Sequence, residues 1–267
     1  MGIINVTPDS FSDGGEFAKM KSDSFEVNLD KILYKVESFV KQGASLIDIG
    51  GESTRPGALS VSLDNELERT IPVIEAIKRN LDIRLSIDTS SPIVMTEAIA
   101  AGVEMINDVR ALSVPGAIEV AVNSNVAICL MHMMGQPESM QKAFHYKNVV
   151  SDVSDFLRAR IAACKRVGDI NQRLLIDPGF GFGKSIQHNY RLLKFLSSFK
   201  NLGYPVLVGI SRKSMIGDVV NRPTEQRVHG SVAATALAIN NGASIIRTHD
   251  VAATMDVIRV HCAYKNA

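Results

Sequence analysis

Short apolar runs that stop at a polar side chain recur along the chain, and an amphipathic segment follows each of them. The clearest copy is Leu174-Leu175-Ile176, which stops at Asp177 and opens into a glycine-rich loop. An apolar run of this length is typical of a buried strand, and residues 189–199 have helical spacing. The same pattern predicts strands at residues 2–6, 46–49, 84–88, 104–109, 126–131, 174–176, 205–210 and 243–247.

Helical periodicity predicts a helix between successive strands and one after the last. These helices fall at residues 29–42, 64–80, 92–101, 115–123, 149–167, 189–199, 224–240 and 251–260. Strict alternation with short loops predicts the α/β class and a (β/α)8 TIM barrel. A doubly wound open sheet also alternates, but it would place a G-x-G-x-x-G turn after the first strand, and Asn5-Val6-Thr7-Pro8 does not fit.

We therefore expect a single barrel domain over residues 1–267. Because the sequence opens directly on a strand, residues that precede Met1 can be missing from it. Residues 16–28 are polar and poorly patterned, and we expect a mobile extension of the first loop there.

Composition and charge exclude several classes of protein. A net charge of +1 gives no electrostatic reason to expect nucleic acid or an acidic membrane surface as a partner. We find no transmembrane or signal-peptide pattern. Cys129, Cys164 and Cys262 cannot all pair and lack metal-ligand spacing, so we expect reduced thiols in a cytoplasmic protein.

The chemistry is concentrated where the predicted strands end. In a parallel barrel the carboxyl ends of all strands meet at one face, where active sites are built. The polar residues at these ends are Asn5, Asp48, Asp88, Asn107, His132, Asp177, Lys213, Arg247 and His249. Any one of them could be a structural group, but so many in register predict a ligand site.

The residue types suggest a ligand with two different ends. Carboxylates and an amide (Asp88, Asn107, Asp177) suit a heterocycle that presents N–H donors. Arg55, Arg247 and His249 suit a phosphate-bearing end, and Asn5 suits a hard cation such as Mg²⁺. Neither a histidine–cysteine cluster for zinc nor a G-x-S-x-G nucleophile is present.

Three further features near the strand ends are interpreted one at a time. Asp48 is equally well explained as a scaffold for the second loop or as a ligand contact. Met131 is expected to line the pocket, and His132 to be structural. Gly183-Lys184-Ser185 looks like the end of a P-loop, but Pro178 stands where that motif needs glycine, so we reject a P-loop.

Two long motifs carry a resemblance to a known family. Residues 2–15, GIINVTPDSFSDGG, and residues 48–57, DIGGESTRPG, resemble the first and second signatures of the dihydropteroate synthase family. Shorter matches follow in the family's order at residues 87–89, 106–108, 130–133, 177–184, 211–217 and 247–250. The resemblance covers essentially the whole chain, apart from the abrupt start and a longer segment at residues 16–28.

The resemblance implies an enzyme, a transferase of folate biosynthesis that sulfonamides inhibit by competition. p-Aminobenzoate would attack the methylene carbon of 7,8-dihydropterin-6-ylmethyl diphosphate, and dihydropteroate and Mg²⁺-bound pyrophosphate would form. The pterin would be held by Asp88, Asn107, Asp177 and Lys213, and the diphosphate by Arg55, Arg247 and His249. Asn5 would bind Mg²⁺. The aminobenzoate site would be bordered by Thr54, Pro56, Phe182 and Ser211.

The step is expected to be SN1-like, because the pterin ring delocalises a cation at the methylene carbon. We expect Asp9 and Asp13, on the first loop, to stabilise that cation. A homodimer is expected from the family's habit and from the alanine-rich face of residues 224–240. The alternatives are a non-catalytic pterin-binding relative, which should have lost some of the diphosphate residues, and a methyltetrahydrofolate-binding methyltransferase domain, which has no use for Lys213.

Overall fold

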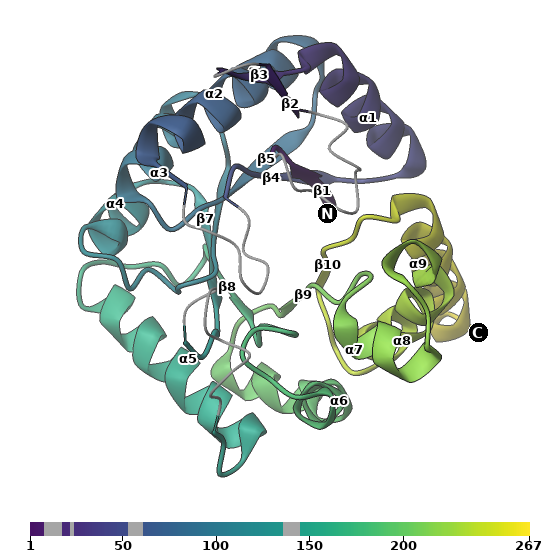
Figure 1. Ribbon diagram of the computed structural model, residues 1–267. Coiled ribbons are helices and arrows are strands. Elements are labelled where there is room, and N and C mark those ends of the chain that lie inside the picture. The colour runs from purple at the N-terminus through teal and green to yellow at the C-terminus, as the bar shows by residue number, and fades with distance from the viewer. Residues whose placement is uncertain (8–17, 22–23, 53–60, 136–144) are drawn as a thin grey trace.

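The computed structural model describes residues 1–7, 18–21, 24–52, 61–135 and 145–267. Within these residues, parallel strands form the wall of a barrel (Figure 1). The strands of the wall are β1 Gly2–Asn5, β4 Leu46–Gly50, β5 Arg84–Asp88, β6 Met105–Asp108, β7 Ala127–Met131, β8 Leu174–Asp177, β9 Leu207–Val208 and β10 Ile245–Ile246.

Two sets of contacts close the barrel. β1, β4, β5, β6, β7 and β8 form one continuous parallel sheet, and β9 pairs with β10. A bridge between Ile176 and Val206 joins β8 to β9. On the other side, the Ile3 amide donates to the Thr248 carbonyl at 3.2 Å, and the Thr248 amide donates to the Met1 carbonyl at 3.0 Å. The predicted (β/α)8 barrel is confirmed.

Helices cover the outside of the strands (Figure 1). Those between β1 and β8 are α1 Leu29–Gln42, α2 Leu63–Asn80, α3 Pro92–Ala100, α4 Ala117–Asn123 and α5 Val149–Lys165. The rest are α6 Ile186–Lys194, α7 Ser214–Val220, α8 Val228–Asn240 and α9 Val251–Lys265, with short 3-10 turns η1 Leu196–Leu202 and η2 Thr224–Gln226. α1 ends as the sequence predicts, because Gly43 takes a left-handed conformation (φ 105°) and donates to the Phe39 and Val40 carbonyls.

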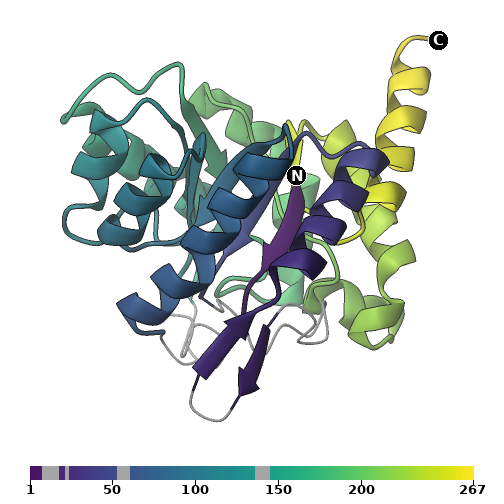
Figure 2. The ribbon, with the colours of Figure 1, turned by 90° about the horizontal axis from the view of Figure 1, so that it is seen from above.

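Two local expectations are corrected. Residues 18–27 contain an antiparallel hairpin of β2 Ala18–Lys21 and β3 Ser24–Val27, where we expected a loop extension. The hairpin projects from the end of the barrel at which β1 stops (Figure 2). The helix expected at residues 189–199 begins earlier, at a capping box of Ser185 and His188, and it gives way to η1 after Lys194.

Alternate residues of the strands point into the barrel, and they form two layers of different chemistry. At the amino ends the inward residues are apolar: Met105, Cys129, Leu175 and Leu207 form one buried cluster, against which Met1, Leu46 and Ile245 pack. Further along most of the strands, the same face carries polar groups, whereas β7 has Met131 there. They include Asn5, Asp48, Asn107, Asp177 and Arg247. The pleat therefore places a buried polar floor at the carboxyl ends of the strands.

Candidate active site

Arg247 is the centre of the polar layer. It follows β10, and its Nε donates to Asp48 Oδ2 at 2.6 Å while its Nη2 donates to Asp88 Oδ2 at 2.8 Å. These contacts join Arg247 to residues on β4 and β5 that lie 199 and 159 positions away in sequence. A planar guanidinium with a fixed fork of donors can hold two carboxylates in this way. Asp48, Asp88 and Arg247 thus form one charged network.

Asp48 supports the functional residues from below. Its side chain is fully buried, and Oδ2 also accepts a hydrogen bond from Asn107 Nδ2 at 3.1 Å. One N–H of the Asn107 amide is used there, so its side-chain oxygen and its second N–H can face a ligand. These contacts make Asp48 a scaffold for Arg247 and Asn107.

Asp88 has an unusual protonation equilibrium. Burial raises the pKa of its carboxyl to about 7, Arg247 opposes that rise, and the neighbouring Asp48 adds to it. The carboxylates of Asp48 and Asp88 therefore share one guanidinium at a cost in free energy. A cation that enters this end of the site is favoured by the same charges.

Asp177 and Lys213 form the second charged group. Asp177 ends β8, and its Oδ1 accepts from the Gly179 amide at 2.7 Å, which fixes its carboxylate. Burial raises the pKa of Asp177, while Lys213 opposes that rise. Burial lowers the pKa of Lys213 to about 8, against the attraction of Asp177. The Lys213 ammonium lies 4.4 Å from the centre of the Phe182 ring and donates to the Phe180 carbonyl.

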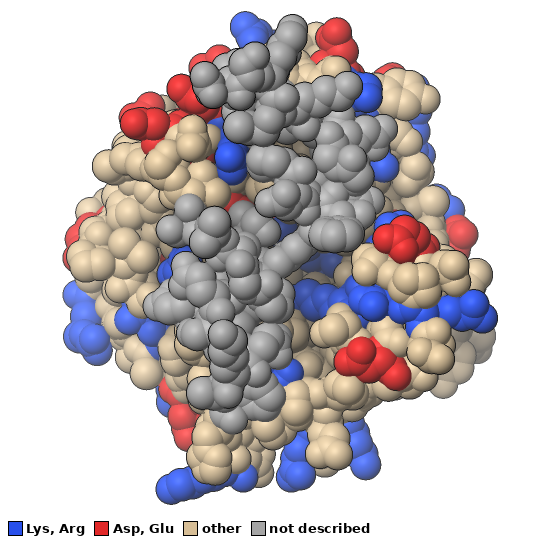
Figure 3. All heavy atoms as spheres, viewed as in Figure 1, with Lys and Arg blue, Asp and Glu red and all other residues tan. Residues whose placement is uncertain are grey.

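Ser211 and His249 meet beside Arg247. Ser211 Oγ accepts from the His249 amide at 3.2 Å, which joins the loop after β9 to the loop after β10. Met131 is buried at the end of β7 and lies against Gly179. On the face of the barrel at which the strands end, Lys and Arg side chains gather over the α7 side (Figure 3).

The expectation that His132 is structural is confirmed. It is buried, and its ring stacks edge-on against Phe156 at 4.9 Å. Burial lowers its pKa to about 2, with Lys184 adding to the effect, so the imidazole is neutral. Its Nδ1 lies 2.9 Å from Lys184 Nζ and therefore accepts a hydrogen bond from that ammonium.

Lys184 is the residue of this region that the sequence reading did not assign. It is only 3% exposed and contacts the loop after β8 as well as His132. Its ammonium is held by carbonyl groups, which agrees with the rejection of a P-loop. The sequence signal for Lys184 was a single lysine at the end of a run of glycines and phenylalanines. A charged side chain buried in such a run must have hydrogen-bond partners.

Five residues assigned from the sequence lie outside the described residues: Asp9, Asp13, Thr54, Arg55 and Pro56. Within the described parts, no three His, Cys, Asp or Glu side chains come close enough to hold a metal ion. Asn5 Oδ1 and Asp88 Oδ2 lie within 4 Å of one point beside Gly50. An amide oxygen and a carboxylate suit a hard cation whose other ligands are phosphate and water.

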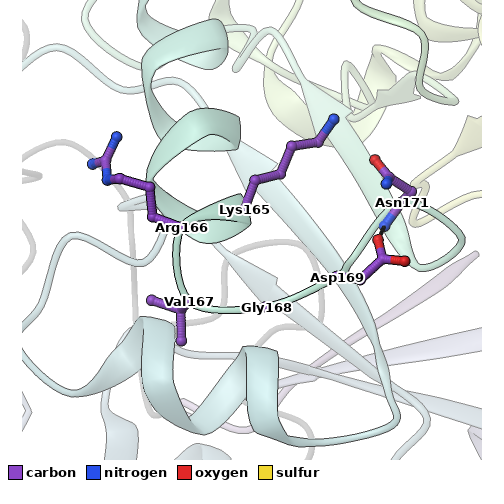
Figure 4. A pocket seen from close by; sticks show the side chains of 6 residues that line it. All are labelled: Lys165, Arg166, Val167, Gly168, Asp169 and Asn171. Atoms are coloured by element: carbon purple, nitrogen blue, oxygen red, sulfur yellow. Dashed lines mark hydrogen bonds between the residues drawn. The ribbon is translucent and has the colours of Figure 1, made fainter.

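A second hollow lies away from this site. It has a volume of about 350 Å³ and is lined by Lys165, Arg166, Val167, Gly168, Asp169 and Asn171 (Figure 4). The lining residues connect the end of α5 to the start of β8, so the hollow is at the amino ends of the strands. Arg166 points away from Lys165 there.

In the described residues, no helix has the length and apolar character needed to cross a membrane. Cys129 and Cys164 are buried and Cys262 is exposed, and all three are free thiols.

Known proteins similar to this chain share both its sequence and its fold. The family model described as pterin binding enzyme matches residues 1–249. A dihydropteroate synthase of Haemophilus influenzae is 50% identical over 267 residues, which covers 100% of this chain and 94% of the relative.

Two solved structures agree with that match. A Yersinia pestis dihydropteroate synthase with a sulfonamide drug complex has a TM-score of 0.94 at 48% identity, covering 100% of this chain and 94% of the other. A Xanthomonas albilineans dihydropteroate synthase with 4-aminobenzoic acid has a TM-score of 0.90 at 48% identity, covering 100% and 93%. Matches at this identity over the whole length show common descent together with the fold. The chain therefore belongs to the pterin-binding enzyme family, and within that family to the dihydropteroate synthases.

Proposed function

We propose that the polar layer at the carboxyl ends of the strands binds 7,8-dihydropterin-6-ylmethyl diphosphate beside p-aminobenzoate and joins the two. The observation that carries this is the layer itself, in which acceptors (Asp88, Asn107, Asp177) and cations (Lys213, Arg247) lie together at the carboxyl ends of the strands. Acceptors suit the N–H groups of the pterin, and cations suit its diphosphate.

Asp177 and Lys213 are assigned to the pterin ring. The carboxylate of Asp177 is already fixed by the Gly179 amide, and its free lone pairs can accept from the amino and ring N–H groups. Lys213 stands opposite and can donate to ring acceptors. The Phe182 ring beneath Lys213 supplies an apolar border, on which we place the aminobenzoate.

Arg247 and His249, with Arg55, are assigned to the diphosphate. Asp48 and Asp88 hold the Arg247 guanidinium in place before substrate arrives, so little reorganisation is needed as charge develops on the leaving oxygen. Asn5 would hold Mg²⁺, which would supply further positive charge to the diphosphate oxygens.

In the reaction, the bond between the methylene carbon and the diphosphate oxygen breaks, and the electron pair leaves with pyrophosphate. The pterin ring delocalises the positive charge left on the carbon. The amine nitrogen of p-aminobenzoate then forms the new C–N bond and loses a proton to solvent. A strong general base is unnecessary, because the secondary ammonium formed is acidic; positioning supplies much of the rate.

The same proposal covers the remaining expectations. Sulfonamides would compete with p-aminobenzoate, residues 1–267 would form one domain, and free thiols suit the cytoplasm. Asp9 and Asp13 stay predicted to stabilise the cation, and Thr54 and Pro56 to border the aminobenzoate.

The function is tested by measuring pyrophosphate release from the pterin diphosphate with Mg²⁺, with and without p-aminobenzoate, while dihydropteroate is followed. We expect release coupled one-to-one to dihydropteroate. Asn5→Ala should raise the Mg²⁺ concentration that gives half-maximal release. Tight pterin binding without product would instead indicate a binding protein.

We also propose that the chain forms a homodimer through α8 and its neighbours. Leu237 on α8 is 53% exposed, and Val219 on α7 and Val260 on α9 are also exposed, although all three are large and apolar. Exposed apolar side chains on adjacent helices favour an interface. Light scattering should give twice the chain mass, and Leu237→Glu should shift it toward the monomer, with Tyr34→Glu on α1 as the control.

A further inference from the structure

Lys184 is buried and its ammonium has four close polar neighbours, although no role in the site has been assigned to it. Its ammonium lies 2.7 Å from the Gly179 carbonyl oxygen, 2.9 Å from the Phe182 carbonyl oxygen and 2.9 Å from His132 Nδ1. The His132 carbonyl oxygen is a fourth neighbour at 3.3 Å. The contacts therefore connect the loop after β8 to the residue that follows β7.

The partners of Lys184 fit the charged form. Three of the four are carbonyl oxygens, which only accept, and an ammonium has three N–H groups to donate, whereas a neutral amine has two and a lone pair. Burial lowers the pKa of Lys184, and the carboxylate of Asp177 opposes that effect. The neutral His132 ring presents an acceptor because Lys184 is there.

The loop that Lys184 holds also positions the pterin residues. The Gly179 carbonyl accepts from Lys184, and the Gly179 amide donates to Asp177 Oδ1 at 2.7 Å. The Phe180 carbonyl, one residue on, accepts from Lys213. The loop lies so close to β7 that a Cβ atom on Gly179 would stand 1.8 Å from the His132 carbonyl oxygen. A shift of this loop therefore displaces both Asp177 and Lys213.

We propose that Lys184 is a positioning residue for the pterin end of the site: it fixes the backbone of residues 179–182 against the end of β7, and it places a buried positive charge near Asp177. This inference rests on the proposed function, because its purpose is to keep Asp177 in place and ionised for the pterin N–H groups. Lys184 itself touches no substrate in this scheme.

The charge role is defined by the groups around Asp177. The cations that favour its ionised form are Lys213 from the loop before α7, Lys184, and Arg247 after β10. The Gly179 amide also favours it, burial disfavours it, and the Cys129 thiol on β7 faces it in neutral form. Without the positive charge of Lys184, less opposes the effect of burial, which raises the pKa of Asp177. The Asp177 carboxylate is then protonated at a higher pH.

Lys184→Met removes both the hydrogen bonds and the charge. We expect KM for the pterin diphosphate to rise about 10- to 100-fold, the range for losing buried hydrogen bonds to a charged group. The acid limb of kcat/KM against pH should move to higher pH, because a less stabilised Asp177 protonates earlier. Affinity for pyrophosphate, which contacts the other end of the site, should change less than about twofold.

Lys184→Gln separates the hydrogen bonds of Lys184 from its positive charge. It also replaces Lys184→Met in the test if that variant does not fold. A glutamine amide can still donate to two carbonyls but has no charge, so we expect the acid-limb shift with a smaller rise in KM. Lys194→Met, at the exposed end of α6, is the matched control and should behave as wild type.

Three outcomes are distinguishable. A wild-type protein that makes no dihydropteroate would overturn the proposed function. A wild-type protein that makes it, with Lys184 variants of unchanged KM and pH profile, would overturn the role of Lys184. Equal losses of pterin and pyrophosphate affinity with no pH shift would show general loosening of the barrel and would also overturn it.

Discussion

Asp177→Asn is expected to lower kcat/KM for the pterin diphosphate by about a thousandfold, from the loss of two hydrogen bonds to a charged acceptor at roughly 1.5–3 kcal/mol each. The ionised carboxylate accepts from neighbouring N–H groups, whereas an asparagine offers one acceptor and turns two donors toward the ligand. The loss should be carried mainly by KM, since the pterin is held by the same contacts before and during the reaction. Steady-state kinetics with varied pterin diphosphate measure it.

The fold should survive this substitution. The Gly179 amide donates to Asp177 Oδ1, and an asparagine oxygen can accept the same bond. Asp155→Asn, on an exposed position of α5, is the control for general effects of removing a carboxylate. If kcat/KM of Asp177→Asn stayed within about tenfold of wild type, the two hydrogen bonds assigned to this carboxylate would be wrong.

Arg247→Met is expected to have the largest effect on stability, a loss of about 3–5 kcal/mol in the free energy of unfolding near pH 8. The substitution leaves Asp48 and Asp88 buried side by side without the guanidinium that both contact. Removing one partner of a buried ion pair leaves uncompensated charge, whereas most substitutions cost far less. Urea unfolding of the ligand-free protein measures this loss.

The loss should depend on pH in a defined direction. The folded-state pKa of Asp88 is about 7 even with Arg247 present, and without Arg247 it should rise further. A raised carboxyl pKa stabilises the folded state at low pH, and this contribution is lost as the pH rises through the folded pKa. The deficit of Arg247→Met should therefore be smaller near pH 5.5, which is below the folded-state pKa of Asp88 with or without Arg247, so that the carboxyl is protonated and uncharged.

Arg247→Lys is the matched control. A lysine keeps one positive charge but cannot donate along two fixed directions, so it should recover part of the stability and little of the diphosphate affinity. A deficit that is the same at both pH values would show that Asp88 does not take up a proton when Arg247 is removed.

Much of the fold could be predicted because its signals are local. The period of two in the strands and the helical spacing in α1 repeat over a few residues, and Gly43 ends α1 at the predicted place. The prediction was less accurate where local patterns are weak. The β2–β3 hairpin alternates apolar and polar residues over only four positions in each strand, α7 is short, and α6 stops at Lys194 although apolar spacing continues.

The residues of the site could also be predicted only in part. The strand-end rule selected Asp48, Asp88, Asn107, Asp177 and Arg247 without any structure, because each follows an apolar run. The partner of each side chain could not be predicted, since Arg247 meets Asp48 and Asp88 only through closure of the barrel. Lys184 was missed because one of the residues that hold its buried ammonium is His132, which follows β7 and is distant in sequence.

The sequence by itself determined the number and order of the strand–helix units, the end of the barrel that carries the chemistry, and the family, because these depend on short patterns and long motifs. Only the tertiary structure decided which charges share a contact, which carboxyls have raised pKa values, and which lysine holds the loop after β8. These properties depend on distance and burial, and residues separated by up to 199 positions set them together.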